Sequence, residues 1–149
     1  MTTGFVSHHV AISVRNAEES IRFYEYFGFR VVATWFAKDN SLTIVHMALP
    51  EGFVLELFYY AKNAESPVLE LGVGNDLEAL GVKHFGFHVS DLVSVRERMV
   101  ADGRNVTELK HGRTKVDYFF VSDPDGIWVE VVEDTRTLSA STPLVLHEE

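Results

Sequence analysis

The chain repeats itself at intervals of 74 and 75 residues. The run from His9 to Val14 returns 75 residues later as the run from His84 to Val89. The run from Pro50 to Glu56 returns 74 residues later as the run from Pro124 to Glu130. Each half thus carries one histidine near its start and one glutamate near its end. The sequence therefore predicts two copies of one structural unit.

The composition excludes several classes of function. The 149 residues suit one compact domain or two small repeats that share a core. The chain has no cysteine, so any metal site must use nitrogen and oxygen ligands. A net charge of −9 argues against nucleic-acid binding, which needs a basic surface. Because we find neither a long apolar stretch nor a signal-peptide pattern, we expect a cytoplasmic protein without membrane contact.

Apolar residues alternate with polar ones in the expected strands and recur at helical spacing in the expected helices. These two patterns predict the order βαβββ for each half. The helices are expected to begin after the capping residues Asn16 and Asp91 and to end at Gly28 and Gly103. The expected strands of the first half are 5–14, 30–36, 43–49 and 53–60. Those of the second half are 83–89, 106–109, 116–122 and 127–133.

This order places the chain in the α+β class. We expect the two βαβββ repeats to form a curved sheet or half-barrel around a central cleft, with the helices outside. The first module covers residues 5–60 and the second covers residues 81–134. Residues 61–80 form the linker, and residues 135–149 form a tail.

Strand parity decides which side chains share a face. The apolar residues of the first strand must face the helix, so His9 faces the opposite side, and the same holds for His84 and His88. Glu56 and Glu130 lie inside apolar runs, where a lone carboxylate is costly to bury. A metal bound by both would offset that cost. We therefore predict one divalent metal ion held by His9, Glu56, His84 and Glu130.

Several other residues are open to two interpretations. We interpret His46, a lone strand histidine, as structural. His88 faces the cleft side and is either a substrate contact or a packed core residue. Tyr60 and Trp128 face the same side and either line an apolar pocket or pack in the core.

A basic loop precedes the strand that begins at Val116. It contains Lys110, Arg113 and Lys115. We interpret it as a solvated turn, and the alternative is a clamp on an anionic substrate.

Linked segments of the chain resemble the vicinal oxygen chelate superfamily, also called the glyoxalase, bleomycin-resistance and extradiol-dioxygenase group. The resemblance covers about residues 5 to 134. It rests on residues 9–16, 20–24 followed by 28–29, 55–57, 84–89 and 123–126. The ligand pattern is most similar to glyoxalase I, which implies His9, Glu56, His84 and Glu130 as the metal ligands. Compact bacterial members prefer nickel or cobalt and longer members use zinc, so we expect Ni, Co, Zn, Mn or Fe.

The chain departs from glyoxalase I at two positions that help to hold the carboxylate of glutathione. Where those enzymes have an arginine and an asparagine, this chain has Ser13 and Tyr60. The resemblance therefore implies a substrate other than a glutathione adduct. We assign substrate contacts to Ser13, Tyr60, His88 and Trp128.

The resemblance also implies a mechanism in which a carboxylate beside the metal moves a proton between neighbouring atoms of the substrate. Glu130 and Glu56 are the candidate bases. One alternative is an extradiol-type iron oxygenase, which uses two histidines and one carboxylate, so that Glu56 argues against it. Another is a non-catalytic drug-binding resistance protein, although such members lack the ligand set. We expect a homodimer, and the linker permits the repeats to pair within one chain or between two.

Overall fold

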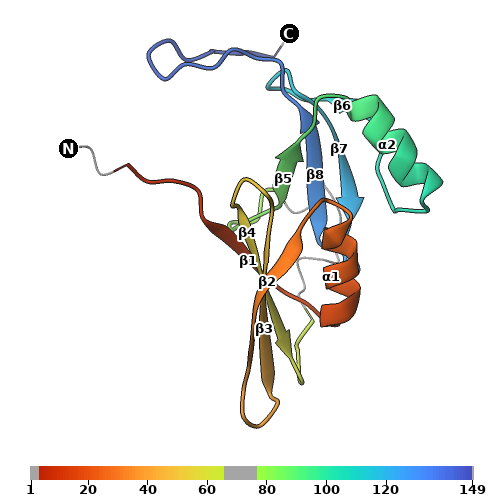
Figure 1. The fold of residues 1–149 in the computed structure, drawn as a ribbon. Coiled ribbons are helices and arrows are strands. Elements are labelled where there is room, and N and C mark those ends of the chain that lie inside the picture. Colours follow the sequence, from red (N-terminus) through yellow and green to blue (C-terminus); the bar gives the residue numbers. More distant parts are fainter. Residues whose placement is uncertain (1–3, 66–76, 149) are drawn as a thin grey trace. The chain divides into compact units, whose positions relative to one another are not determined.

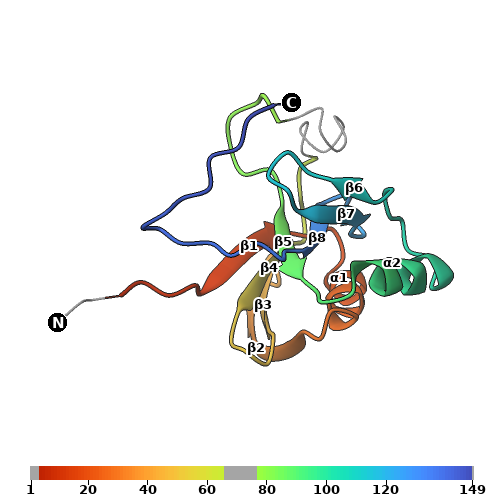
Figure 2. The same cartoon turned by 90° about the horizontal axis from the view of Figure 1, so that it is seen from above.

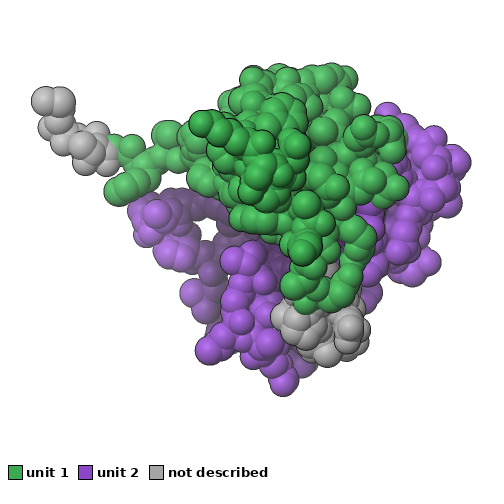
Figure 3. Space-filling model, turned by 90° about the horizontal axis from the view of Figure 1, so that it is seen from below, with its two compact units in different colours: residues 1–70 green, residues 71–149 purple. Residues whose placement is uncertain are grey.

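The computed structural model describes residues 4–65 and 77–148. The chain divides into two compact units, residues 1–70 and residues 71–149 (Figure 3). Within the described residues, each unit consists of one helix and one four-stranded sheet in the order βαβββ (Figure 1). The predicted α+β class with two βαβββ repeats is confirmed. In the same part of the chain, no helix is long and apolar enough to cross a membrane.

Unit 1 consists of β1 (His9–Ser13), α1 (Ala17–Glu25), β2 (Arg30–Phe36), β3 (Leu42–Ala48) and β4 (Val54–Tyr60). The order across its sheet is β1-β4-β3-β2. β1 runs parallel to β4, and the other neighbours are antiparallel. The first strand of the unit therefore lies beside the last one, which brings the start and the end of the repeat together.

Unit 2 consists of β5 (Phe85–His88), α2 (Leu92–Ala101), β6 (Lys110–His111), β7 (Asp117–Ser122) and β8 (Trp128–Glu133). Its sheet has the matching order β5-β8-β7-β6, with β5 parallel to β8. After β8 the chain runs away from the sheet, and residues 134–148 contain no helix or strand (Figure 2). Residues 66–76, inside the predicted linker, lie outside the described residues.

The two helices begin after the predicted capping residues and end shortly before the predicted glycines. The side chain of Asn16 accepts a hydrogen bond from the N–H of Glu19, and that of Asp91 accepts one from the N–H of Ser94. The backbone N–H and the hydroxyl of Ser94 both donate to the Asp91 carboxylate, and these two hydrogen bonds hold the pKa of Asp91 below its ordinary value. Past the helix ends, Gly28 and Gly103 have φ angles of 97° and 73°, which residues with a Cβ rarely adopt.

Each sheet has a buried face and a face that carries polar side chains. In β4 the fully buried residues are Leu55 and Leu57, and in β8 they are Val129 and Val131. α1 contacts β4, and α2 contacts β7 and β8, so these residues form the helix-facing cores. Glu56 and Glu130 alternate with them and therefore lie on the opposite faces. The parity expected from the sequence is observed in both units.

One predicted strand is wrong. Residues 106–109 make a single bridge, between Val106 and Val121, and the short strand β6 lies one residue further on. The cause is Thr107, whose side-chain oxygen accepts from the N–H of Phe120 at 2.9 Å. A hydroxyl thus takes the place of a backbone carbonyl in the ladder, and regular pairing resumes only at Lys110.

Candidate functional site

Unit 2 brings together two of the predicted metal ligands. His84 immediately precedes β5, and its Nε2 lies 3.1 Å from Oε2 of Glu130 on β8. The parallel pairing of β5 with β8, in which Gly86 lies opposite Glu130, produces this contact. The ring of His84 also packs edge-to-face on Phe120 at 4.9 Å between centroids. The imidazole is therefore held between a carboxylate and an aromatic wall.

Gly86 allows this close approach of the two strands. A Cβ at this position would lie 3.0 Å from both Cβ and the backbone oxygen of Glu130. Such distances are tighter than ordinary packing permits. A glycine is therefore required if Glu130 is to keep its present position beside His84.

The His84–Glu130 pair lines a cavity of about 670 Å³ within unit 2. Its aromatic lining is formed by Tyr118, Phe120 and Trp128, and its basic lining by Lys83, Lys110 and Arg113. Trp128 thus lines a pocket, as one interpretation expected. Lys110 and Arg113 of the basic loop are exposed and line the same cavity. This position is compatible with both interpretations of the loop, a solvated turn and a clamp on an anionic substrate.

In unit 1 the structure pairs Glu56 with His46, for which the sequence indicated a structural role. Nε2 of His46 lies 2.6 Å from Oε2 of Glu56, and the two residues are directly opposite on β3 and β4. His9 has the backbone position equivalent to His84, but its Nδ1 lies 2.9 Å from Nδ1 of His8. The signal for His46 was present in the sequence. The tight turn at 50–52 fixes the hairpin register, and that register places residue 46 opposite residue 56.

The remaining predicted site residues lie on the same faces as the glutamates. Ser13 ends β1, opposite Phe58, and Tyr60 ends β4 with 43% of its surface exposed. His88 lies two residues after Gly86 on β5 and is exposed.

The donor set of these faces fits a divalent metal. Imidazole nitrogens and carboxylate oxygens are ligands of nickel, cobalt, zinc and iron, and each unit supplies such a pair. Among the residues that the structure describes, no group of three or more histidine, aspartate or glutamate side chains is placed to hold a metal ion. The four-residue set draws two residues from each unit, and it stays a prediction.

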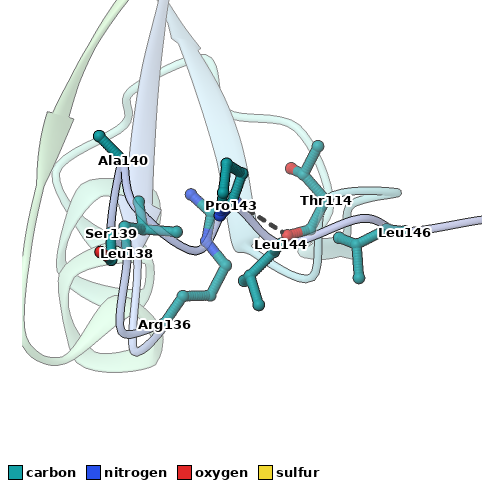
Figure 4. A pocket seen from close by; sticks show the side chains of 8 residues that line it. All are labelled: Thr114, Arg136, Leu138, Ser139, Ala140, Pro143, Leu144 and Leu146. Carbon is teal, nitrogen blue, oxygen red and sulfur yellow. Dashed lines mark hydrogen bonds between the residues drawn. The ribbon is translucent and has the colours of Figure 1, made fainter.

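A second cavity, of about 480 Å³, lies under the tail of unit 2 (Figure 4). Arg136 lines it, donates to the backbone oxygen of Thr114 at 3.0 Å and forms a two-pronged ion pair with Asp134. Hydrogen bonds from Arg136 lower the pKa of Asp134 to about 2. The other residues that line this cavity are small or apolar, among them Leu138, Pro143 and Leu144. This cavity contains no paired histidine and glutamate among its lining residues, so it is not the candidate site.

The fold and the site define a class of protein built from two βαβββ units, each with a histidine–glutamate pair on the face away from its helix. Comparison with known proteins gives the family. The family model, built from sequences, of the Glyoxalase/Bleomycin resistance protein/Dioxygenase superfamily matches residues 7–131 of this chain. The chain belongs to this superfamily.

Individual relatives are similar at low identity. Lactoylglutathione lyase of Schizosaccharomyces pombe is 30% identical over 141 residues, which cover 88% of this chain and 46% of that protein. Lactoylglutathione lyase of Pseudomonas aeruginosa is 29% identical over 153 residues, covering 89% and 85%. A solved glyoxalase family protein from Enterococcus faecalis has a TM-score of 0.71 at 26% identity, covering 85% of this chain and 95% of that one. The chain spans slightly less than half the length of the Schizosaccharomyces pombe protein and of Glyoxalase I of Saccharomyces cerevisiae, which it also matches.

Proposed function

We propose that this protein is a metal-dependent lyase or isomerase of the glyoxalase I type, which moves a proton next to a carbonyl group. The observation that carries the proposal is the His84–Glu130 pair in a cavity lined by aromatic and basic side chains. The relatives named lactoylglutathione lyase support the same class of reaction.

The proposed ligands are His9, Glu56, His84 and Glu130, and the ion is Ni, Co, Zn, Mn or Fe. They would meet when the two units pair, either in one chain or between the chains of a homodimer. A divalent ion bound there would polarise the substrate carbonyl and stabilise the charge that develops on it.

The chain's own residues supply the proton transfer. The carboxylate of Glu130 accepts a proton from the carbon beside the carbonyl, while the electron pair moves toward the carbonyl oxygen, and the acid then returns the proton to the neighbouring carbon. Glu56 is the other candidate base. Phe120 and Trp128 exclude water from the reacting atoms, which strengthens the electrostatic interactions there.

The cavity and the two departures from glyoxalase I describe the substrate. Ser13 and Tyr60 cannot replace an arginine and an amide as anchors for glutathione, so we propose a smaller substrate with two adjacent oxygens. Lys110 and Arg113 would bind an anionic group on it, and Trp128 would pack against its apolar part.

Proton exchange in deuterated water tests this function. Metal-loaded protein is incubated with hydroxypyruvate, with neutral hydroxyacetone, and with methylglyoxal plus glutathione, and exchange is followed by NMR. We expect metal-dependent exchange that favours the anionic probe, and kcat/KM on the glutathione adduct below about 10⁴ M⁻¹s⁻¹. Glu130→Gln should lower exchange by about 10²–10⁴-fold at equal metal occupancy.

Two outcomes would contradict the proposal. Efficient turnover of the glutathione adduct would show that the substrate assignment is wrong. Equal exchange by Glu130→Gln and the unmodified protein would remove Glu130 from the role of base and leave Glu56.

A further inference from the structure

We propose that His46 is a positioning residue, which holds Glu56 as the stationary carboxylate of the site. This inference rests on the proposed function, because it concerns what happens to the two glutamates when a metal binds. The resemblance to glyoxalase I assigns no role to this histidine, and its place as a lone strand histidine indicated a structural role.

The contact between His46 and Glu56 is short and supported by the sheet. The two residues are direct partners in the antiparallel ladder of β3 and β4, and Nε2 lies 2.6 Å from Oε2. The side chain of Glu56 is 21% exposed and that of His46 is 40% exposed. A hydrogen bond to a carboxylate at this distance is of the strong, charge-assisted kind. It engages Oε2 of Glu56, and Oε1 takes no part in it.

The repeat shows that this histidine is particular to unit 1. The residue 74 positions after His46 is Phe120, which lies opposite Glu130 in the ladder of β7 and β8. A phenylalanine side chain cannot donate a hydrogen bond to a carboxylate. In unit 2, therefore, the partner of the glutamate is His84, at 3.1 Å, and this residue is itself a proposed ligand.

The two glutamates should then respond differently to a metal. A histidine nitrogen that binds a cation has no proton to donate, so binding through Nε2 of His84 would end its hydrogen bond to Glu130. His46 is outside the proposed ligand set and would keep its bond to Glu56. Glu56 would stay fixed by His46 as well as by the metal, whereas Glu130 would be held by the metal alone and could leave it to accept the proton. This difference assigns the proton transfer to Glu130.

Cobalt binding by three variants tests the role of His46. His46→Phe installs the residue that unit 2 has at this position, so the site loses a donor while the size of the side chain is kept. His46→Gln keeps an N–H donor of similar reach, and His147→Phe removes an exposed histidine of the tail as a control. Affinity is measured by titration with Co²⁺, and the ligand geometry is followed by the visible absorption of bound Co²⁺.

We expect His46→Phe to bind Co²⁺ about 10–100-fold more weakly, as is usual when a partner of a metal ligand is removed. His46→Gln should recover most of that loss, with the same absorption spectrum as the unmodified protein, and His147→Phe should be unchanged. Circular dichroism checks that each variant is folded, and His46→Ala replaces the phenylalanine variant if that one does not fold.

Three outcomes would overturn the proposal, and they are distinguishable. If His46→Phe binds Co²⁺ as tightly as the unmodified protein, the positioning role is wrong and the metal site stands. If the spectrum changes in both His46 variants, His46 is a direct ligand. If the unmodified protein does not bind Co²⁺, the proposed metal-dependent function fails and the positioning role fails with it.

Discussion

Among the glycines that the structure describes, Gly86 leaves the least room for an added side chain. An added methyl group would lie 3.0 Å from two atoms of Glu130, so either β5 or the glutamate must move. We predict that Gly86→Ala lowers the free energy of unfolding by about 1–3 kcal/mol, the usual cost of overpacking. Urea unfolding monitored by circular dichroism measures this change.

The repeat provides the control for Gly86. Ala11 has the equivalent position in unit 1, opposite Glu56, where the structure accommodates a methyl group. Ala11→Gly removes that methyl group without a clash and should cost only about 0.5–1 kcal/mol, from the greater freedom of the unfolded chain. If Gly86→Ala is as stable as the unmodified protein, the strands of unit 2 have room that the structure does not show.

At the same scale, the sequence predicted the proximity of His84 and Glu130 but not that of His46 and Glu56. The contact of His84 with Glu130 follows from their equivalent places in the repeat and from strand parity. The contact of His46 with Glu56 depends on the register of one hairpin, which a pattern of apolar residues alone does not give. Lys110 and Arg113 line the same cavity as the pair because of the path of the chain through β6 and the turn after it, which periodicity cannot predict.

At the scale of elements, the segment between α2 and β7 is the part in which the sequence prediction failed. Both helices and most strands have strong local signals, namely side-chain caps, positive-φ glycines and alternating apolar residues. Residues 106–109 have the composition of a strand, but the N–H of Phe120 donates to the side-chain oxygen of Thr107, and the N–H of Thr107 donates to the backbone oxygen of Phe120. The pattern of apolar and polar residues cannot predict that a side-chain hydroxyl replaces a backbone carbonyl as the acceptor.

This segment gives a prediction about Thr107. Thr107→Val is nearly isosteric but removes the acceptor of the Phe120 N–H, which belongs to a buried residue. We expect the variant to lose about 1–3 kcal/mol of stability, the cost of a buried donor without its partner. Urea unfolding measures the loss, and Thr43→Val, the same exchange in β3, is the control. A variant as stable as the unmodified protein would show that another acceptor replaces the hydroxyl.

At the scale of the whole molecule, the central question is whether one metal takes ligands from both units. A ligand that binds only the folded state at 100 times its dissociation constant stabilises that state by about 2.7 kcal/mol, equivalent to roughly 5–10 °C in Tm for a chain of this size. If His9 and His84 bind the same ion, His9→Ala and His84→Ala should each lose most of this increase. The tail variant His147→Ala should keep all of it. Thermal unfolding with and without Co²⁺, at two protein concentrations, measures the increase for each variant.

The pattern of loss also reports how the units pair. If the increase in Tm depends on protein concentration, the two units that share the ion come from different chains, because association then contributes to stability. An increase independent of concentration would place both units in one chain or in a dimer that does not dissociate. If His9→Ala keeps the full increase while His84→Ala loses it, the predicted ligand set is wrong and the ion is bound by unit 2 without His9.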